Sequence, residues 1–315
     1  MKKNVLLLII FLCSSYSYSQ SINELNSFKK VAKFLNKEVS KKYTFESVFE
    51  NEKEADEEAF NEVVKKIDVD NNGHTDLIIN AYKLFIIVLS NGQSKFKELS
   101  FKNKNRFLGN TAEFDSITKI RNETVFIFNT EIDEDDETVY ANVITKKGQK
   151  KQLFDLTTKE YKWVIEDIKF RVDSLTIKFG ELVSYTNKKS VLKNKIKDLH
   201  FYTTGCFGTC PIFELNLNSN GDLRYTGKKF TNYEGIKTTK LDSTDLENLF
   251  GLLEYADLKN LKDFYSVTWT DDQTGILKVT FENEEVKEIQ DYGLRGTIDL
   301  QAIYAKLFEI NKKIK

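Results

Sequence analysis

Proline and cysteine, two residue types that this chain otherwise avoids, meet in one short stretch. Residues 204–211 (Thr-Gly-Cys-Phe-Gly-Thr-Cys-Pro) hold the only proline of the 315-residue chain and two of its three cysteines. Cys206 and Cys210 are four positions apart, and the two glycines of the stretch give the backbone the freedom that disulfide geometry demands. We therefore expect a Cys206–Cys210 disulfide that fixes one turn of the fold.

The energy of such a bridge limits its role. Closing a loop of five residues stabilises a protein by only about 2 kcal/mol in the loop-entropy description. The bridge is then a local clip that shapes the residues between the two cysteines and does not hold a domain together. We predict that these residues, Phe207, Gly208 and Thr209, form a contact loop.

Two other roles for the cysteines compete with the clip. Thiol redox chemistry usually has two residues between the cysteines at a helix N-terminus, whereas here three residues intervene and Pro211 and a predicted strand follow. A metal site could use Cys206, Cys210 and His200, but a fourth ligand is missing from the stretch.

The N-terminus has the pattern of a secretory signal. A pair of lysines precedes the apolar run Val5–Leu12, which is far too short to span a membrane. Small residues at 17 and 19 predict cleavage before Gln20, and we expect an exported protein. Cys13 suggests a lipid anchor as the alternative, but Leu12 stands where lipoprotein signals have a small residue.

Charge and composition exclude some classes of partner. The chain has 47 basic and 48 acidic residues, and the signal segment (residues 1–19) removes only two lysines. A near-neutral chain gives no reason to expect nucleic acid or an anionic surface as a partner. With 40% hydrophobic residues it can bury a core, and its length predicts about two domains. No later segment is apolar enough for a transmembrane span.

The hydrophobic pattern divides the mature chain into four parts. Residues 20–58 form a helical N-terminal segment with a helix predicted at residues 21–40, which a Ser21–Glu24 capping box starts. Residues 59–186 form a β-rich domain, residues 187–197 a lysine-rich linker, and residues 198–315 a second domain. The fold class is α+β: an N-terminal helix and a mainly antiparallel β domain, followed by an antiparallel sheet with two helices on one face.

Short runs rich in β-branched and aromatic residues, several of them bounded by Asn-Gly or Lys-Gly turns, mark the strands of the first domain. They are Leu77–Tyr82, Leu84–Ser90, Lys95–Phe101, Thr124–Asn129, Thr138–Thr145, Tyr161–Phe170 and Ser174–Phe179, with turns at 91–92, 109–110 and 147–148. In the second domain we predict strands at 199–203, 212–217, 223–226, 236–241, 276–281 and 286–292. Its helices begin near Thr244 and at Thr297.

An acidic loop at residues 68–76 has the spacing of a calcium site. Asp68, Asp70, Asn72 and Asp76 stand at loop positions 1, 3, 5 and 9, and His74 would supply its backbone carbonyl at position 7. Hard oxygen ligands in a flexible loop suit Ca²⁺ better than a transition metal. An EF-hand is excluded because position 12 is not the glutamate that this motif needs. We predict a structural Ca²⁺ site; the alternative is an Asx-rich hairpin turn without an ion.

Two stretches resemble known families. Residues 67–101, with the acidic loop leading into a buried strand, resemble a single calcium-loop unit of the integrin-type and VCBS-type β repeats. Such repeats usually come in arrays, and this chain shows one copy. Residues 196–312, with Gly-Cys-Phe-Gly-Thr-Cys-Pro and the hairpin 221–227, resemble a family of secreted bacterial domains of unknown function. That resemblance implies a fold and no mechanism.

The function classes that remain are few. The chain has only two histidines and lacks the Gly-x-Ser-x-Gly, phosphate-loop and dinucleotide fingerprints. We therefore expect a non-enzymatic binding or envelope-associated module whose partner is a protein or a glycan. The alternative is a carboxylate-dependent glycan hydrolase that uses Asp271 and Asp272 beside Trp269. A thiol oxidoreductase is a third possibility.

Overall fold

The computed structural model describes residues 21–50, 57–81, 84–92, 95–100, 112–131, 143–155, 158–186, 194–267 and 269–315. It is a mixed α+β structure with mainly antiparallel sheets. The predicted signal segment, Cys13 and the turn at 109–110 lie outside the described residues. Within the described part of the chain, no helix is long and apolar enough to cross a membrane.

The first residues of the described chain form several short helices. The single helix predicted for residues 21–40 is divided, because Ser27 accepts a hydrogen bond from Lys30 N and starts a new helix there. The helical elements are η1 (Ile22–Glu24), α1 (Phe28–Phe34), the π-helical turn η2 (Leu35–Val39), α2 (Phe45–Phe49) and α3 (Glu57–Val63). Their apolar side chains form one core with the adjacent sheet.

That sheet is a four-stranded antiparallel meander with the acidic loop between its first two strands. Its strands are β1 (Val64–Ile67), β2 (Asp76–Ala81), β3 (Leu84–Ser90) and β4 (Phe96–Ser100). Every residue of β3 is buried, because alternate side chains face different layers. Ile86 and Val88 pack against the helices, whereas Phe85 and Ile87 pack against a second sheet.

The second sheet differs from the prediction in its strand lengths. It consists of β5 (Ala112–Ile120), β6 (Glu123–Glu131), β7 (Val143–Asp155), β8 (Glu160–Lys178) and β9 (Glu181–Ser184), in the order β5-β6-β8-β7 with β9 beside β8. The two strands predicted for 161–170 and 174–179 are one continuous strand. The turn predicted at 147–148 is instead a bulge inside β7, where the register with β8 shifts.

The C-terminal domain is a seven-stranded sheet that shares one core with two helices. Its strands are β10 (Ile196–Thr203), β11 (Ile212–Asn218), β12 (Asp222–Lys229), β13 (Gly235–Lys240), β14 (Phe264–Ser266), β15 (Thr274–Phe281) and β16 (Val286–Tyr292). The order is β13-β12-β11-β10-β15-β16-β14, and only the β14–β16 pair is parallel. The end of the predicted linker, residues 196–197, belongs to β10.

Two helices, α5 (Ser243–Tyr255) and α6 (Ile298–Lys313), complete this domain, with the short η6 (Leu258–Asn260) after α5. The N-cap of α5 is Asp242, which accepts from Thr244 N at 2.9 Å, so the helix begins slightly before the predicted start. Thr297 caps α6 as predicted. Leu249 and Leu253 of α5 and Leu300 and Leu307 of α6 are buried in the same core as the inward side chains of the sheet.

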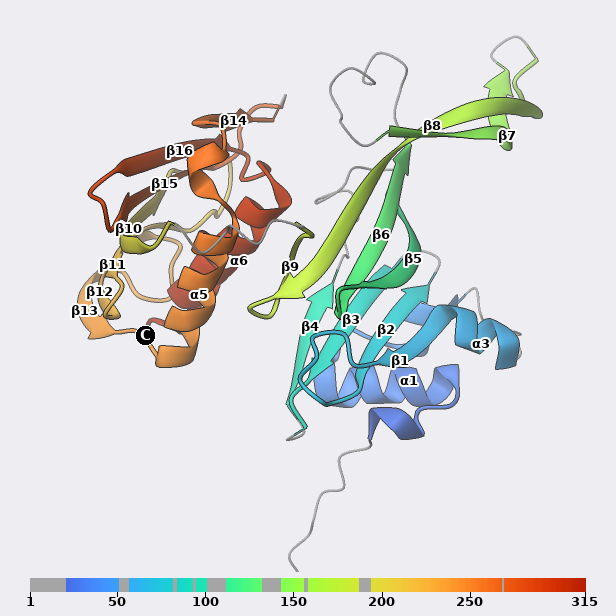
Figure 1. The fold of residues 1–315 in the computed structure, drawn as a ribbon, viewed down its shortest axis with the longest axis horizontal. Coiled ribbons are helices and arrows are strands. Elements are labelled where there is room, and N and C mark those ends of the chain that lie inside the picture. Colours follow the sequence, from blue (N-terminus) through green and yellow to red (C-terminus); the bar gives the residue numbers. More distant parts are fainter. Residues whose placement is uncertain are drawn as a thin grey trace, which may run out of the picture.

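The β8–β9 hairpin joins the two halves of the molecule (Figure 1). Its two-residue turn has left-handed backbone at both Phe179 (φ 53°) and Gly180 (φ 69°), which is costly for phenylalanine. The Phe179 ring lies directly over Gly251 of α5, where an added Cβ would be 2.3 Å from a ring carbon. Val183 of β9 is fully buried in the core of the C-terminal domain.

A buried charge cluster lies beside this turn. Glu181 Oε1 is 2.6 Å from Lys97 Nζ on β4 and 3.2 Å from Lys306 Nζ on α6. Lys97 also donates to the Gly180 carbonyl at 2.6 Å. One carboxylate therefore connects the first sheet, the β8–β9 turn and the last helix.

Candidate functional site

The predicted disulfide between Cys206 and Cys210 is present, with 5.8 Å between the two Cα atoms. A buried side chain from another strand fixes the same loop. Gln273, which is 4% exposed, donates from its Nε2 to the carbonyls of Thr204 at 2.9 Å and Pro211 at 2.7 Å. These two carbonyls lie at the two ends of the loop. The disulfide and the Gln273 side-chain amide therefore both hold its ends together.

The tip of the loop is held from a third side. The backbone N–H of Phe207 donates to the carbonyl of Asp271 at 3.0 Å. With its backbone fixed in this way, the Phe207 ring is 91% exposed, more than any other large apolar side chain of the described residues. A fixed loop that presents a bare aromatic ring is typical of a binding surface.

A groove of about 750 Å³ lies beside the loop. One wall is the loop itself, and the other is α6, whose Ala305, Phe308 and Lys312 line it. Residues 272–273 and 293–295 line it as well. This volume is within the range of small-molecule and peptide sites, which is roughly 300–1,000 Å³.

Two polar side chains of α6 lie on the inner side of the groove. Gln301 is 9% exposed and Tyr304 is 3% exposed, and both line the groove. The Tyr304 hydroxyl makes no hydrogen bond of good geometry. Burial raises its pKa, and the nearby charge of Asp291 raises it further. The hydroxyl is therefore neutral and able to donate.

Asp291 organises the turn below this part of the groove. It is fully buried, and its carboxylate accepts from Arg295 N at 3.1 Å and from Gly296 N at 2.8 Å. Burial raises the pKa of Asp291, while these two backbone hydrogen bonds act in the opposite direction. At Gly296 an added Cβ would lie 2.7 Å from the carboxylate, so the turn accepts only glycine without rearrangement.

Of the two acids proposed for glycan hydrolysis, Asp272 lines the groove and Asp271 precedes it in the same turn. Asp272 Oδ2 accepts from the indole N–H of Trp269 at 3.0 Å, and its Oδ1 accepts from Gln273 N at 2.7 Å. Asp271 has left-handed backbone (φ 68°) and an exposed side chain. The Arg295 guanidinium lies 5.5 Å from the Trp269 ring centre. The visible role of both acids is to shape the turn that holds Phe207.

His200 has a partner on the neighbouring strand. Its Nε2 lies 3.0 Å from Glu214 Oε1, and Lys228 Nζ lies 3.5 Å from the other oxygen of this carboxylate. The pKa of Glu214 is lowered: burial acts to raise it, but the hydrogen bond from His200 outweighs that together with the other partners. The contacts that the structure gives His200 are thus with the sheet and not with the cysteine loop.

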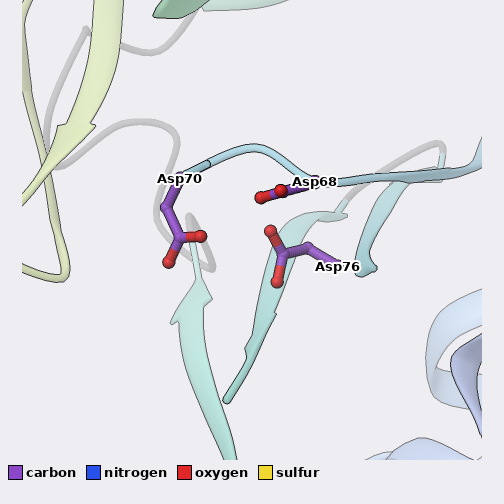
Figure 2. A group of neighbouring side chains, drawn as sticks. All are labelled: Asp68, Asp70 and Asp76. Carbon is purple, nitrogen blue, oxygen red and sulfur yellow. The ribbon is translucent and has the colours of Figure 1, made fainter. Parts of the chain in front are cut away.

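The acidic loop brings together three of its five predicted ligands. Ligand atoms of Asp68, Asp70 and Asp76 all lie within 4.8 Å of one another, and Figure 2 shows the carboxylates turned toward a common space. Gly73 (φ 84°) and Asn71 (φ 58°) give the loop its left-handed turns.

The side chains of Asn72 and His74 also take part in the structure of this loop. Asn72 Oδ1 accepts from His74 N at 2.8 Å, and its Nδ2 donates to the Ser90 carbonyl at 2.7 Å. The His74 ring packs on Gly92, where an added Cβ would be 2.3 Å from a ring carbon. Asn72 and His74 therefore hold the loop to the β3–β4 turn.

Asp76 connects the acidic loop to the sheet. It is fully buried and accepts from Val69 N at 2.8 Å and from Ser90 N at 2.7 Å. Burial raises its pKa to about 6, and repulsion from Asp70 and Asp68 adds to this. Burial likewise raises the pKa of Asp70. Three carboxylates at this separation form a cluster of hard-oxygen donors, the ligand type that divalent cations such as Mg²⁺ and Ca²⁺ prefer.

Comparison with known proteins bears on the C-terminal domain. Residues 197–311 match a family described as a domain of unknown function (DUF6438). A domain of this family is therefore found where the sequence resemblance predicted an unknown-function domain. The matched residues run from β10 almost to the end of α6 and contain the cysteine loop and the groove. No curated protein matches the chain.

Sequence reasoning found the loop but missed the groove. The residues that line the groove come from four separate segments, around 206–211, 272–273, 293–295 and 301–312. The role of Gln273 could not be predicted, because the sequence does not show which backbone carbonyls its amide reaches. Tyr304 and Phe308 have the helical spacing of core residues and pack in or against the core, so their spacing does not reveal that both also line the groove.

Proposed function

We propose that the chain is an exported, non-enzymatic binding module that contacts a partner in the cell envelope through the cysteine loop and its groove. The observation that carries this proposal is the 91% exposure of Phe207 on a loop fixed by a disulfide, by Gln273 and by Asp271. Fixing a loop in advance lowers the entropy lost on binding, and a bare aromatic ring is the usual anchor of an interface.

The lining of the groove supports binding better than catalysis. Its apolar wall and the buried amide of Gln301 are suited to hold a ligand by contact and hydrogen bonds. Asp272 already accepts two hydrogen bonds from its own turn. The disulfide is followed by Pro211 and strand β11 and not by the helix N-terminus that usually carries a redox-active cysteine pair.

Position-specific crosslinking tests this function. A photo-crosslinking phenylalanine analogue is placed at position 207 in the full chain, and at position 230 as the matched control. Phe230 is 43% exposed at the end of β12 and is not part of the groove. On illumination of intact cells, we expect a discrete product from position 207 and none from position 230.

Two outcomes of this experiment would contradict the proposed function. If positions 207 and 230 give the same pattern, or neither gives a product, the loop is not the contact site. A product from position 207 that disappears when Gln273→Ala loosens the loop would show that the fixed backbone matters. Purified Gln273→Ala protein must keep its far-ultraviolet circular dichroism for that comparison to count.

We also propose that the acidic loop holds a structural Ca²⁺ ion, with Asp68, Asp70 and Asp76 as ligands. The support is the convergence of three carboxylates at a loop that resembles the calcium loops of integrin-type β repeats. The ion would neutralise the mutual repulsion of these acids and fix the β1–β2 connection. An extracellular site of this kind binds at roughly 10⁻⁴–10⁻³ M, which suits an exported protein.

Chelation tests the ion site. At 10 mM Ca²⁺ a site with a dissociation constant of about 1 mM stabilises the fold by about 1.4 kcal/mol. We expect CaCl₂ to raise the melting temperature relative to EDTA in the native chain and not in Asp68→Asn/Asp70→Asn. MgCl₂ is the ionic-strength control. Equal melting temperatures of the native chain in CaCl₂ and EDTA would contradict the site.

A further inference from the structure

The outer part of the β7–β8 hairpin has a feature that the proposed function does not use. β6 pairs with β8 only between Phe170 and Leu175, so in the described chain residues 160–169 of β8 pair with β7 alone. Figure 1 shows this part of β7 and β8 extending past the end of β6. A two-stranded ribbon has no second layer of its own to cover its apolar side chains.

An apolar row lies on one face of this ribbon. Tyr161, Trp163 and Ile165 alternate along β8, so their side chains project from the same face. They are 68%, 68% and 72% exposed, and among large apolar side chains of the described residues only Phe207 is more exposed. Three such neighbours in a row mark an interaction surface and not the scattered exposure normal for a soluble surface.

The ribbon is also locally basic. The segment from 143 to 170 contains seven lysines and four acidic residues, in a chain whose formal net charge is −1. Lys150 lies directly opposite Ile165 on β7, so it projects from the same face as the apolar row. Lys159, two residues before Tyr161, is exposed. Positive charge therefore borders the row on the neighbouring strand and near its outer end.

We infer that this ribbon docks on the surface of an anionic phospholipid bilayer. Tryptophan and tyrosine favour the boundary between acyl chains and headgroups, where the ring is in an apolar layer and its polar atom stays hydrated. Lysines beside them reach the headgroup phosphates and are attracted by the negative surface potential. The row and its lysines have this combination on one narrow projecting element.

The size of the row favours lipid over protein. At roughly 150–250 Å² for an aromatic side chain and somewhat less for isoleucine, the exposed parts of the three side chains present about 400 Å². A stable protein interface buries about 800 Å² on each partner. A bilayer needs no complementary shape, so a narrow ribbon can enter it where a protein partner would find too little surface. A second copy pairing along the edge strand β7 is the occupant that the test must separate from lipid.

Tryptophan fluorescence can report on this surface directly, because the chain contains only two tryptophans. In the full chain with Trp269→Phe, Trp163 is the sole reporter. Vesicles of phosphatidylglycerol and phosphatidylcholine in equal parts are added, and vesicles of phosphatidylcholine alone are the comparison. We expect a blue shift of Trp163 emission with the anionic vesicles and a much smaller one with the neutral vesicles.

Matched variants in the same background assign the effect to the ribbon. Tyr161→Ser/Ile165→Ser should remove the shift, whereas Ile236→Ser, which changes a 59% exposed residue of β13, should leave it intact. At about 1 kcal/mol for each lysine near a charged membrane, Lys150→Gln/Lys159→Gln should weaken binding roughly 30-fold. All variants share the same N-terminal segment, so its own affinity for lipid cancels from the comparison.

Three outcomes overturn the inference: no shift with anionic vesicles, an equal shift with neutral vesicles, or a shift that follows protein concentration without vesicles. The last would identify a second copy as the occupant. Vesicle cosedimentation of the native chain repeats the test without Trp269→Phe, in case that substitution disturbs the fold. Loss of this binding would leave the crosslinking at position 207 unaffected, so the two proposals fail separately.

Discussion

At the scale of single residues, buried polar groups decide how the C-terminal domain is built. Gln273 and Asp291 each satisfy two backbone groups of a loop, Gln273 as a double donor and Asp291 as a double acceptor. Both are buried, and both act on loops that line the groove. The shape of the groove therefore depends on two side chains that can be tested one at a time.

Asp291 gives a pH prediction. The pKa of an aspartate in an unfolded chain is about 4. Burial raises the pKa of Asp291 in the folded chain above that value. Between these two values the folded state keeps a proton that the unfolded state releases. The free energy of unfolding therefore falls as pH rises through this window, and the loss is complete above the folded pKa.

We expect Asp291→Asn to remove this part of the pH dependence. The measurement is urea unfolding of both proteins at steps from pH 4 to pH 7. Because Asp76, Asp70 and Asp299 also have raised pKa values, only the difference between the two proteins isolates Asp291. Stability curves that stay parallel over the whole range would show that the buried carboxylate does not titrate there.

At the scale of elements, an ion pair connects the β8–β9 turn to α6. Glu181 pairs with both Lys97 and Lys306 at this turn, and Lys306 is also 3.1 Å from Glu309 Oε2. Removing one partner from a buried ion pair is costly, because the remaining charge stays desolvated without compensation.

The substitution Glu181→Gln should therefore lower the free energy of unfolding by roughly 3 kcal/mol, the lower part of the range for buried pairs. Glu309→Gln removes a more exposed partner of Lys306 and should cost less than about 1 kcal/mol. Chemical denaturation measures both. Equal effects of the two substitutions would mean that the cluster is solvated and contributes little.

The elements that the sequence revealed are those with a clear apolar period. The strands predicted at Leu84–Ser90 and 286–292 have the observed bounds, and those predicted at 77–82 and 95–101 differ by one residue at each end. The strand predicted at 138–145 begins outside the described residues, and within them β7 (Val143–Asp155) continues ten residues past the predicted end. The sequence did not reveal this second half, because it lacks apolar alternation. Its pairing comes from β8 and not from its own side chains.

The candidate sites could be predicted only where their residues lie close together in the sequence. Cys206–Cys210 and the cluster of Asp68, Asp70 and Asp76 lie within single loops, so spacing alone could predict them. The groove needs the tertiary fold to bring four segments together. The basic ribbon was hidden by the near-neutral composition of the whole chain, because charge averaged over 315 residues says nothing of its local concentration.

At the scale of the whole molecule, the matched family region and the folded unit have different boundaries. The family match begins at residue 197, yet Val183 is fully buried in the core of that domain. Ser184 also takes part: its N–H donates to Asp299 at 2.7 Å and its carbonyl accepts from the Tyr255 hydroxyl at 2.8 Å. The C-terminal domain is thus completed by a hairpin from the preceding part of the chain.

This arrangement predicts that a substitution outside the matched region weakens the domain inside it. Val183→Ala should destabilise the C-terminal domain by about 2 kcal/mol, since it removes buried methyl groups and leaves a cavity. Some β10 and α6 amides exchange only when the whole domain opens. Their hydrogen exchange should become roughly 30-fold faster, because a loss of about 2 kcal/mol in stability makes the open state about 30 times more populated.

The control is Val286→Ala, which lies inside the matched region but is 51% exposed. It should change exchange in β10 and α6 by no more than about twofold, the scale of surface substitutions within 0.5 kcal/mol. If Val183→Ala alters only the exchange of β8 and β9, the two halves fold independently and the hairpin merely rests on the domain. Faster exchange in α6 would instead show that the β8–β9 hairpin is part of the folded C-terminal unit, and that the groove on α6 depends on it.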